Sequence, residues 1–268
     1  MKLKLNADRF TGEEYVNLYD KYRPNPPIEI IHQTLNYLNK PKANLVLDLG
    51  CGTGISTEVW SNFSEKIIGL DPSQEMVTVA KNKLSEKNNI QYLHGFAHAI
   101  PLPSKSADII ACSQSFHWME PVSTLNEVHR VLKSNGVFLV YDVIWPPSVN
   151  FELEHSYSKL FERVKQKTAE LKENIAYRWS KKEHLSNISK SKHFTFSKET
   201  FFHKTEKFSK EKFIGIALSQ GGLEALLKRG FTKDEIGVTK FLQEVNSFAD
   251  PFFEEITYNY KAIFNVKK

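Results

Sequence analysis

Glycines at every second position follow a short apolar segment near residue 50, and this run most directly indicates a binding site. The segment Val46 to Leu49 leads into Gly50-Cys51-Gly52-Thr53-Gly54. Glycine lets a backbone approach a ligand closely, and open parallel sheets bind ligands beyond the carboxyl ends of their strands. The run therefore predicts a nucleotide-binding turn between a buried strand and a helix.

An acidic residue, Asp71, follows the next apolar run, residues 66–70. At the end of a second parallel strand its carboxylate can accept hydrogen bonds from both hydroxyls of a ribose. Together with the glycines it predicts an adenosine ligand. Asp71-Pro72-Ser73 also has the composition of a helix start, so the alternative is that Asp71 only caps the following helix. The two roles are compatible.

The spacing of the glycines argues against a nicotinamide dinucleotide. A dinucleotide-binding turn has its third glycine three residues after the second, and Ile55 occupies that position here. A nicotinamide-dependent dehydrogenase is therefore the weaker alternative. A second alternative, a non-enzymatic protein that only binds an adenosyl ligand, keeps the glycines and Asp71 and stays open at this point.

These residues must be positioned by an α/β scaffold, because apolar runs of strand length alternate with helical periodicities over residues 44–144. Such alternation predicts a parallel sheet with helices on both faces. Two later segments alternate as strands and would complete a doubly wound, seven-stranded sheet with an antiparallel C-terminal edge. The expected strands are residues 44–49, 66–70, 90–93, 107–112, 136–144, 193–208 and 254–266.

Two segments look like additions to this scaffold within one domain spanning residues 1–268. Residues 1–25 end in Arg23-Pro24-Asn25-Pro26-Pro27, where proline disfavours helix, and are expected to form an N-terminal lid. Residues 145–192 are polar, lysine-rich and helical in pattern, and are expected to form an inserted substrate cap. From Phe151 to Lys212 the chain has 15 Lys and Arg against 9 Asp and Glu, which places the basic excess in this region.

Five stretches together resemble the class I S-adenosylmethionine-dependent methyltransferases, which have a Rossmann-like fold. These stretches are Asp48 to Gly54, Asp71-Pro72-Ser73, Pro101-Leu102-Pro103, Asp108 and Arg130-Val131-Leu132-Lys133. More narrowly, Tyr22-Arg23-Pro24 and His117-Trp118 resemble the type 11 methyltransferases, including relatives of trans-aconitate methyltransferase. The resemblance implies S-adenosyl-L-methionine as cofactor and transfer of a methyl group to a small-molecule acceptor.

Carried over by position, the resemblance also implies roles for individual residues. Gly50 and Gly52 would face the methionine part of the cofactor, and Asp48 would support its amino group. Asp71 would clamp the ribose, and Met76 would pack on the adenine. These five residues are the expected cofactor contacts between residues 48 and 76.

Further cofactor contacts are expected from the segments on either side. Ala97 would offer its backbone amide to the adenine beside His98, although His98 stands where related sequences usually have a carboxylate. Ser113 would contact the cofactor from the end of the fourth strand. Tyr22 and Arg23 would contact it from the lid, where the guanidinium fork suits the carboxylate of the methionine part. The alternative for Arg23 is a surface arginine.

His117 follows the fourth strand at its carboxyl end and is the candidate catalytic residue. It would act as a general base or would orient the substrate, and a structural role is the alternative. Related methyltransferases have glutamine at this position, which favours orientation. Trp118 is expected to pack. Tyr177-Arg178-Trp179 would grip an anionic or flat substrate, or would pack the cap onto the sheet.

Composition restricts the remaining possibilities. Cys51 and Cys112 lie in or beside apolar runs, and His94 and His98 lack a third ligand nearby, so neither a disulfide framework nor a metal site is expected. The net charge is +5, but the lysines alternate with glutamates and serines, which argues against nucleic-acid binding. No apolar run approaches the length of a membrane span, and Met1 to Arg9 lacks a signal-peptide pattern. We expect a cytoplasmic monomer or homodimer.

Overall fold

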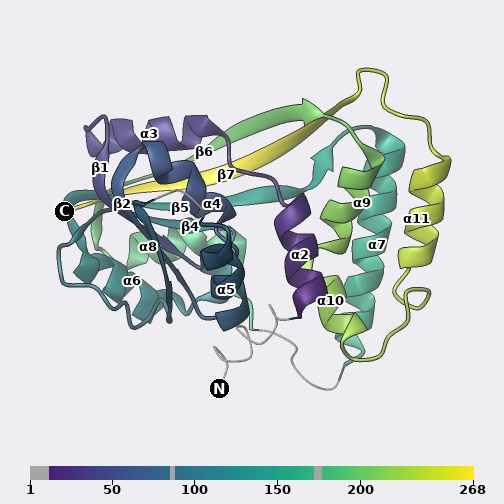
Figure 1. Ribbon diagram of the computed structural model, residues 1–268, viewed down its shortest axis with the longest axis horizontal. Helices are drawn as coiled ribbons and strands as arrows, with labels where there is room; N and C mark the ends of the chain where they lie inside the picture. Colours follow the sequence, from purple (N-terminus) through teal and green to yellow (C-terminus); the bar gives the residue numbers. More distant parts are fainter. Residues whose placement is uncertain (1–11, 85–87, 172–176) are drawn as a thin grey trace.

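The computed structural model describes residues 12–84, 88–171 and 177–268. It contains a seven-stranded sheet with the order β3-β2-β1-β4-β5-β7-β6, in which β1 to β5 are parallel and β7 runs antiparallel to both of its neighbours (Figure 1). The predicted fold class is confirmed. The strands are β1 (Ala43–Leu49), β2 (Ser64–Asp71), β3 (Ile90–His94), β4 (Ala107–Ser113), β5 (Leu132–Ser148), β6 (Phe194–Lys207) and β7 (Glu255–Lys267).

Helices cover both faces of this sheet, so its strands are buried on both sides. In β1, Val46 packs into the core on one face and Leu47 into the core on the other. The first face carries α3 (Ile28–Leu38) and α5 (Gln74–Asn82), and the second carries α6 (Pro121–Val131) and α8 (His184–Lys190). Burial on both faces explains why the central strands are apolar along nearly their whole length.

Several helices begin where a polar side chain caps them. The hydroxyl of Ser73 accepts a hydrogen bond from the backbone N–H of Met76 at 3.3 Å at the start of α5. The carboxylate of Glu120 accepts hydrogen bonds from the backbone N–H groups of Val122 and Ser123 before α6. Such caps satisfy amides that have no partner within the helix, and they fix where each helix leaves the sheet edge that carries the site.

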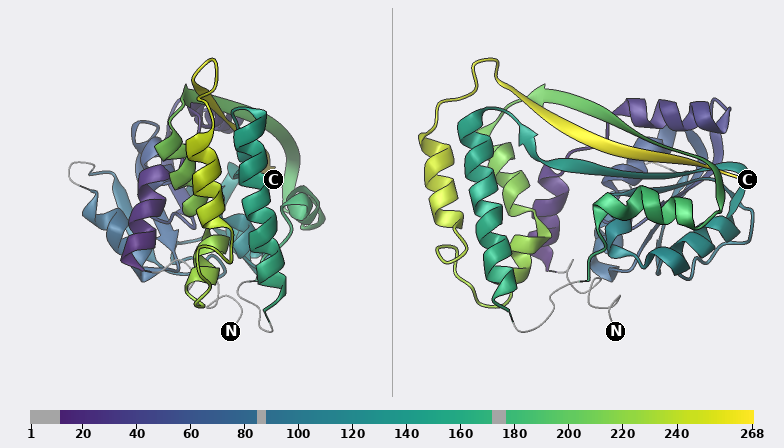
Figure 2. Two further views of the ribbon diagram at one scale, coloured as in Figure 1. Left: turned by 90° about the vertical axis from the view of Figure 1, so that its right-hand side faces the viewer. Right: turned by 180° about the vertical axis from the view of Figure 1, so that it is seen from behind.

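A second group of helices lies beside the sheet and forms what we call the helical lobe (Figures 1 and 2). It consists of α2 (Glu13–Tyr22), α7 (Phe151–Ala169), α9 (Lys210–Leu218), α10 (Gly221–Leu227) and α11 (Val238–Ser247). The long strands β5, β6 and β7 extend from the sheet to this lobe (Figure 2). Tyr157 of α7, Phe213 of α9 and Phe241 of α11 are buried together inside it.

The expected cap, residues 145–192, corresponds to two separate pieces of the structure. Its first helix, α7, belongs to the lobe, whereas α8 packs against α6 and β6 over the sheet. The lobe also contains α9, α10 and α11, which the sequence pattern did not associate with the cap. They join it because their apolar side chains share one core with α7.

The expected lid falls partly outside the described residues, since residues 1–11 are not among them. The described part contains α2, whose Tyr15 and Val16 pack on Met76 of α5. At the C-terminal end of α2, Tyr22 lies against Gly215 of α9, where an added Cβ would come within 2.3 Å of the tyrosine ring. This helix therefore joins the sheet to the lobe.

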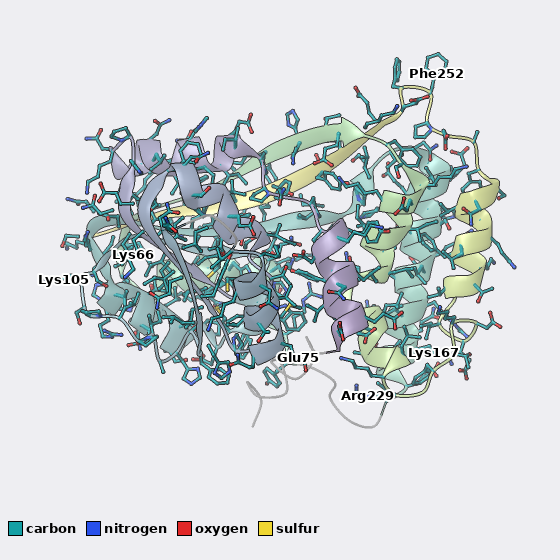
Figure 3. All side chains as sticks on the ribbon, viewed as in Figure 1. Lys66, Glu75, Lys105, Lys167, Arg229 and Phe252 are labelled. Atoms are coloured by element: carbon teal, nitrogen blue, oxygen red, sulfur yellow. The ribbon has the colours of Figure 1, made fainter. Side chains whose placement is uncertain are left out.

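The exposed apolar side chains near the lobe include a pair of phenylalanines in the loop before β7. Phe252 and Phe253 are 94% and 80% exposed (Figure 3). They lie at the far end of the long strands, away from the carboxyl ends of β1 and β2. None of the described helices combines the length and the apolar character that crossing a membrane requires.

Candidate active site

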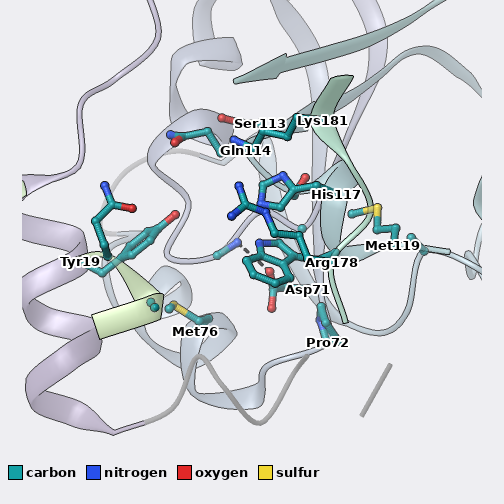
Figure 4. A pocket seen from close by; sticks show the side chains of 18 of the residues that line it. Tyr19, Asp71, Pro72, Met76, Ser113, Gln114, His117, Met119, Arg178 and Lys181 are labelled. Atoms are coloured by element: carbon teal, nitrogen blue, oxygen red, sulfur yellow. Dashed lines mark hydrogen bonds between the residues drawn. The ribbon is translucent and has the colours of Figure 1, made fainter. Parts of the chain in front are cut away.

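A cavity of about 560 Å³ lies between the carboxyl ends of β1, β2 and β4 and the helical lobe (Figure 4). Its walls come from the glycine turn after β1, the loops after β2, β3 and β4, and residues of α2, α7 and the segment after residue 177. A volume of this size suits a small organic ligand. The sequence placed its predicted site residues around this same edge of the sheet.

The glycine turn needs glycine for two separate reasons. Gly50, Gly52 and Gly54 have φ angles of 71°, 54° and 87°, in the left-handed region that side chains disfavour. There is also no room for a side chain, since a Cβ on Gly50 would lie 2.5 Å from Cβ of Ser115 and one on Gly54 would lie 2.1 Å from Oη of Tyr92. Gly50 and Gly52 line the cavity at the positions predicted for them.

Asp71 lines the cavity at the end of β2 and ties the neighbouring backbone together. Its Oδ2 accepts a hydrogen bond from the N–H of Gly52 at 2.9 Å, and its Oδ1 accepts one from the N–H of Ser73 at 2.8 Å. Burial raises the pKa of this carboxyl to about 6, while the two N–H groups oppose that shift. Asp71 therefore both supports the start of α5 and lines the cavity, and the sequence had allowed for these two roles together.

Asp48 does not line the cavity, so the contact predicted between its carboxylate and the amino group of the methionine part is absent from this geometry. The side chain is fully buried behind the glycine turn. Its Oδ2 accepts hydrogen bonds from the hydroxyls of Ser56 at 2.6 Å and Thr57 at 2.7 Å. Burial raises the pKa of Asp48, and its carboxylate ties β1 to the first turn of α4 (Ile55–Val59).

Tyr22 also lies outside the cavity, and Tyr19 lines it instead. The two side chains are about 60° apart around the helix, and Tyr22 packs against Gly215 of α9 while Tyr19 lines the cavity. The hydroxyl of Tyr22 donates a hydrogen bond to Glu211 at 2.7 Å. Arg23 does line the cavity and is held there by hydrogen bonds to the backbone oxygen of Ser219 at 2.9 Å and to Gln220 at 3.0 Å.

The remaining predicted cofactor contacts, Met76, Ala97, His98 and Ser113, all line the cavity. Met76 is 2% exposed and packs under α2, while the ring centroids of Phe96 and His98 lie 5.3 Å apart. Met76, Phe96 and Ala97 make this part of the cavity apolar and aromatic, as a site for a flat heterocycle requires.

His117 belongs to a buried group of charged and polar side chains that we call the Asp142 cluster. Asp142 of β5 lies at its centre, with its Oδ1 3.5 Å from Nδ1 of His117 and 2.5 Å from Nζ of Lys181. Its Oδ2 is 3.9 Å from Nε2 of His184. Because Nδ1 of His117 faces Asp142, Nε2 is the ring nitrogen directed away from it. His117 and Lys181 line the cavity, and Asp142 and His184 support them from behind.

The cluster also has the composition of a metal site. Ligand atoms of His117, Asp142 and His184 all lie within 4.8 Å of one another, and each of these residues is buried. Lys181, however, already provides a positive charge 2.5 Å from Asp142. The ammonium group of Lys181 therefore neutralises the charge of Asp142. His94 and His98 do not belong to this cluster.

Sequence reasoning identified His117 but missed the rest of the cluster. Asp142 and His184 are 42 residues apart in the chain, and no motif connects them. One signal was present: Asp142 interrupts the apolar run of β5, and a charged residue in a buried strand needs a partner.

Protonation states in the cluster follow from burial. Burial lowers the pKa of His117 to about 3 and that of His184 to about 4, with Asp142 opposing both shifts. Burial would raise the pKa of Asp142, but His117 and Lys181 together hold it below its usual range. Burial lowers the pKa of Lys181, and Asp142 opposes that shift. At neutral pH both histidines are therefore neutral and Asp142 is charged.

These shifts predict that acid destabilises the fold through His184. The unfolded chain protonates its histidines near pH 6.5, whereas the folded chain protonates His184 near pH 4, so stability falls as pH falls from 6.5 toward 4. Between pH 7.5 and 5.5, protonation of His184 in the unfolded chain should lower the free energy of unfolding by about 1.4 kcal/mol. Asp71, whose pKa is raised in the folded chain, makes the free energy of unfolding rise as pH falls through 6, so a variant that removes only the histidine is needed. Urea unfolding at both pH values should show His184→Leu losing about 1.4 kcal/mol less than the wild type, and equal losses would contradict this assignment.

The segment after residue 177 is anchored beside His117. The backbone N–H of Trp179 donates a hydrogen bond to the backbone oxygen of His117 at 2.9 Å. The guanidinium of Arg178 lies 5.6 Å from the ring centroid of Trp118 and lines the cavity. Tyr177 and Trp179 contact each other outside the cavity lining, with ring centroids 5.2 Å apart. Of the three residues Tyr177-Arg178-Trp179, the arginine is thus the one that faces the cavity.

Comparison with known proteins places this geometry in a family. A family model described as a methyltransferase domain matches residues 47–140, which contain the glycine turn, Asp71 and His117. Residues 47–140 are a methyltransferase domain. Outside it lie α2, the helical lobe and the last two strands, so this domain supplies the sheet edge and the lobe supplies the facing wall.

Curated relatives match over the same region. The uncharacterized methyltransferase C25B8.09 of Schizosaccharomyces pombe is 34% identical over 119 residues, which are 44% of this chain and 46% of the relative. YcgJ of Bacillus subtilis is 39% identical over 100 residues, 36% of this chain and 40% of the relative. The probable S-adenosylmethionine-dependent methyltransferase CRG1 of Saccharomyces cerevisiae is 26% identical over 137 residues, which are 50% of this chain and 47% of the relative. The match covers less than half the length of these relatives.

Solved structures extend the similarity of fold to nearly the whole chain. A protein from Anaeromyxobacter dehalogenans described as a type II methyltransferase superposes with a TM-score of 0.64 at 16% identity, over 92% of this chain and 98% of that one. The structure of YcgJ from Bacillus subtilis gives 0.54 at 20% identity, over 88% and 99%. The prediction of a class I S-adenosylmethionine-dependent methyltransferase is confirmed for the methyltransferase domain. The narrower resemblance to relatives of trans-aconitate methyltransferase stays a prediction.

Proposed function

We propose that this protein transfers the methyl group of S-adenosylmethionine to a small-molecule acceptor bound between the methyltransferase domain and the helical lobe. The observation that carries the proposal is the position of His117, Arg178 and Lys181 on the same cavity as Gly50 and Asp71 (Figure 4). A protein that only bound an adenosyl ligand would not need a second, polar half of the cavity.

The residues at the sheet edge fit the cofactor. Gly50 and Gly52 expose backbone at the end of β1, and a carboxylate oxygen of Asp71 suits the ribose hydroxyls. Met76 and Ala97 would hold the adenine, and Arg23 is the cation available to the methionine carboxylate. The cofactor supplies an activated methyl group on its sulfonium, so the protein needs no covalent intermediate.

The work left to the protein is alignment of the acceptor and exclusion of water. His117 is neutral and Asp142 holds its Nδ1 side, so Nε2 is left as a hydrogen-bond acceptor that can orient a polar group of the substrate. Tyr19, Trp118 and Trp145 supply apolar walls around the reacting atoms. In this proposal His117 orients the acceptor, and Asp71 orients the cofactor.

Replacing Asp71 with alanine should weaken S-adenosylhomocysteine binding by about 10-fold to 150-fold. The loss has two sources, a charged hydrogen-bond acceptor for the ribose and the acceptor that fixes the N–H of Gly52. Isothermal titration calorimetry measures it directly. Asp234→Ala, an exposed acid in the loop before α11, is the matched control and should bind like the wild type. Wild-type affinity in Asp71→Ala would remove Asp71 from the cofactor site.

Catalysis is tested with methyl-labelled S-adenosylmethionine and a cell extract separated into fractions. We expect S-adenosylhomocysteine to form only when a fraction containing the acceptor is present, and the labelled product to be a small molecule identified by mass spectrometry. Tight cofactor binding without label transfer to any fraction would support a protein that only binds the ligand.

A further inference from the structure

One side of the cavity is cationic. Besides Arg23, which is assigned to the cofactor, three basic side chains line the cavity, namely Lys165 of α7 and Arg178 and Lys181 of the segment after residue 177. The two acidic residues that line the cavity, Asp71 and Glu120, belong to the methyltransferase domain. Glu120 is occupied as the cap of α6, where it accepts hydrogen bonds from Val122 and Ser123.

Two of the three cations have no carboxylate partner among the described residues. Lys181 is neutralised by Asp142, which lies behind it. Arg178 and Lys165 form no ion pair with any residue in the part of the chain that the structure describes. Arg178 instead lies over the face of Trp118, a contact that fixes the direction of its guanidinium without neutralising it.

Apolar side chains surround these charges. Trp118, Trp145, Phe161 and Val164 also line the cavity. A positive group in a partly dry, apolar cavity interacts strongly with an anion, since little solvent competes with it. A planar guanidinium beside an indole suits a planar carboxylate in particular.

We propose that the methyl acceptor is a small organic anion, a carboxylate on an apolar body, and that Arg178 binds its negative group with Lys181 alongside. This inference rests on the proposed function and specifies its substrate class. Lys181 can bind the acceptor's negative group and Asp142 at the same time, because an ammonium has three N–H donors and Asp142 takes up only one side of it. The apolar body would then lie against Trp118 and Trp145, near His117.

The test uses the full-length protein with methyl-labelled S-adenosylmethionine and a cell extract divided on an anion exchanger at pH 7.5. We expect label transfer to acceptors in the retained fraction and little transfer to the unretained one. With that fraction, Arg178→Met should lower kcat/KM at least about tenfold, mainly by raising KM, because it removes a charged hydrogen bond to the substrate. Arg178→Lys should recover part of the loss, and Lys182→Met, an exposed neighbouring lysine, should behave like the wild type.

Cofactor binding separates failure of this inference from failure of the proposed function. Arg178→Met should bind S-adenosylhomocysteine within about twofold of the wild type, because the arginine contacts the acceptor. Transfer to the unretained fraction, or wild-type kinetics in Arg178→Met, would overturn the anionic acceptor and leave the methyltransferase intact. No cofactor binding, or no transfer to either fraction, would contradict the proposed function on which the inference rests.

Discussion

Lys181→Met destabilises the protein by about 3–5 kcal/mol at pH 7, while the additional change Asp142→Leu restores most of that loss. Asp142 is 6% exposed in its side chain, and Lys181 is the cation beside it. Removing the lysine alone leaves a buried carboxylate with only two weak partners, Nδ1 of His117 at 3.5 Å and Nε2 of His184 at 3.9 Å. Removing both charges replaces the pair with apolar groups of similar size, which is often neutral for stability.

Chemical denaturation of the wild type, the two single variants and the double variant measures this coupling as a double-mutant cycle. Lys182→Met is the matched control, because Lys182 is exposed and its removal should change stability by less than about 0.5 kcal/mol. A loss in Lys181→Met no larger than that of the control would show that the ion pair contributes nothing to the fold.

His117→Ala should lower turnover by about 10²-fold or more, whereas His117→Gln should retain most of the activity. An orienting residue only has to offer one hydrogen-bonding atom, and the glutamine amide can supply it. A general base would instead need to take up a proton, and burial has lowered the pKa of His117 to about 3, which makes it a weak base. The rate should therefore show no step near pH 6.5 that depends on His117.

The measurement is turnover at saturating S-adenosylmethionine for the wild type and both variants between pH 6 and 8. Cofactor affinity should stay nearly constant in both variants, because His117 is not among the residues expected to contact the cofactor. Equal losses in His117→Gln and His117→Ala would refute the orienting role. A rate that rises with pH through 6.5 only when His117 is present would identify a general base.

The sequence alone predicted the structure correctly where a residue's role depends on its immediate neighbours in the chain. The glycine turn needs glycine because its backbone has positive φ, and that requirement is visible in the spacing of Gly50, Gly52 and Gly54. The strand segments are visible as alternating periodicities, and the two edge strands as the pattern of residues 193–208 and 254–266. These features are encoded within short windows of sequence.

Prediction failed where the outcome depends on which way an element faces. Tyr22 and Tyr19 belong to the same helix, and only the packing of Tyr22 on Gly215 determines that Tyr19 faces the cavity. Asp48 points behind the glycine turn because Ser56 and Thr57 bind it from α4. Neither orientation can be read from spacing alone.

The sequence also gave no prediction of contacts between segments that are far apart in the chain. The Asp142 cluster joins His117, Asp142 of β5, Lys181 and His184 of α8, which together span 67 positions of sequence. The lobe likewise gathers α2, α7 and α9 to α11 through a shared apolar core. Such groupings depend on tertiary packing, for which a single sequence carries no local signal.

The long strands that connect sheet and lobe determine how the cavity can open. Pairing between β5 and β7 is continuous from Val137 opposite Val266 to Ile144 opposite Asn259, and it resumes at Ser148 opposite Thr257. Up to Ile144 the two paired strands resist bending, because a bend there would stretch many hydrogen bonds at once. The interruption lies in β5 alone, because β7 stays paired with β6 from Phe196 opposite Val266 to Lys207 opposite Glu255. It contains Trp145, a wall of the cavity. A shift of β5 at this point would therefore reshape the wall that receives the acceptor while β6 and β7 keep the lobe attached to the sheet.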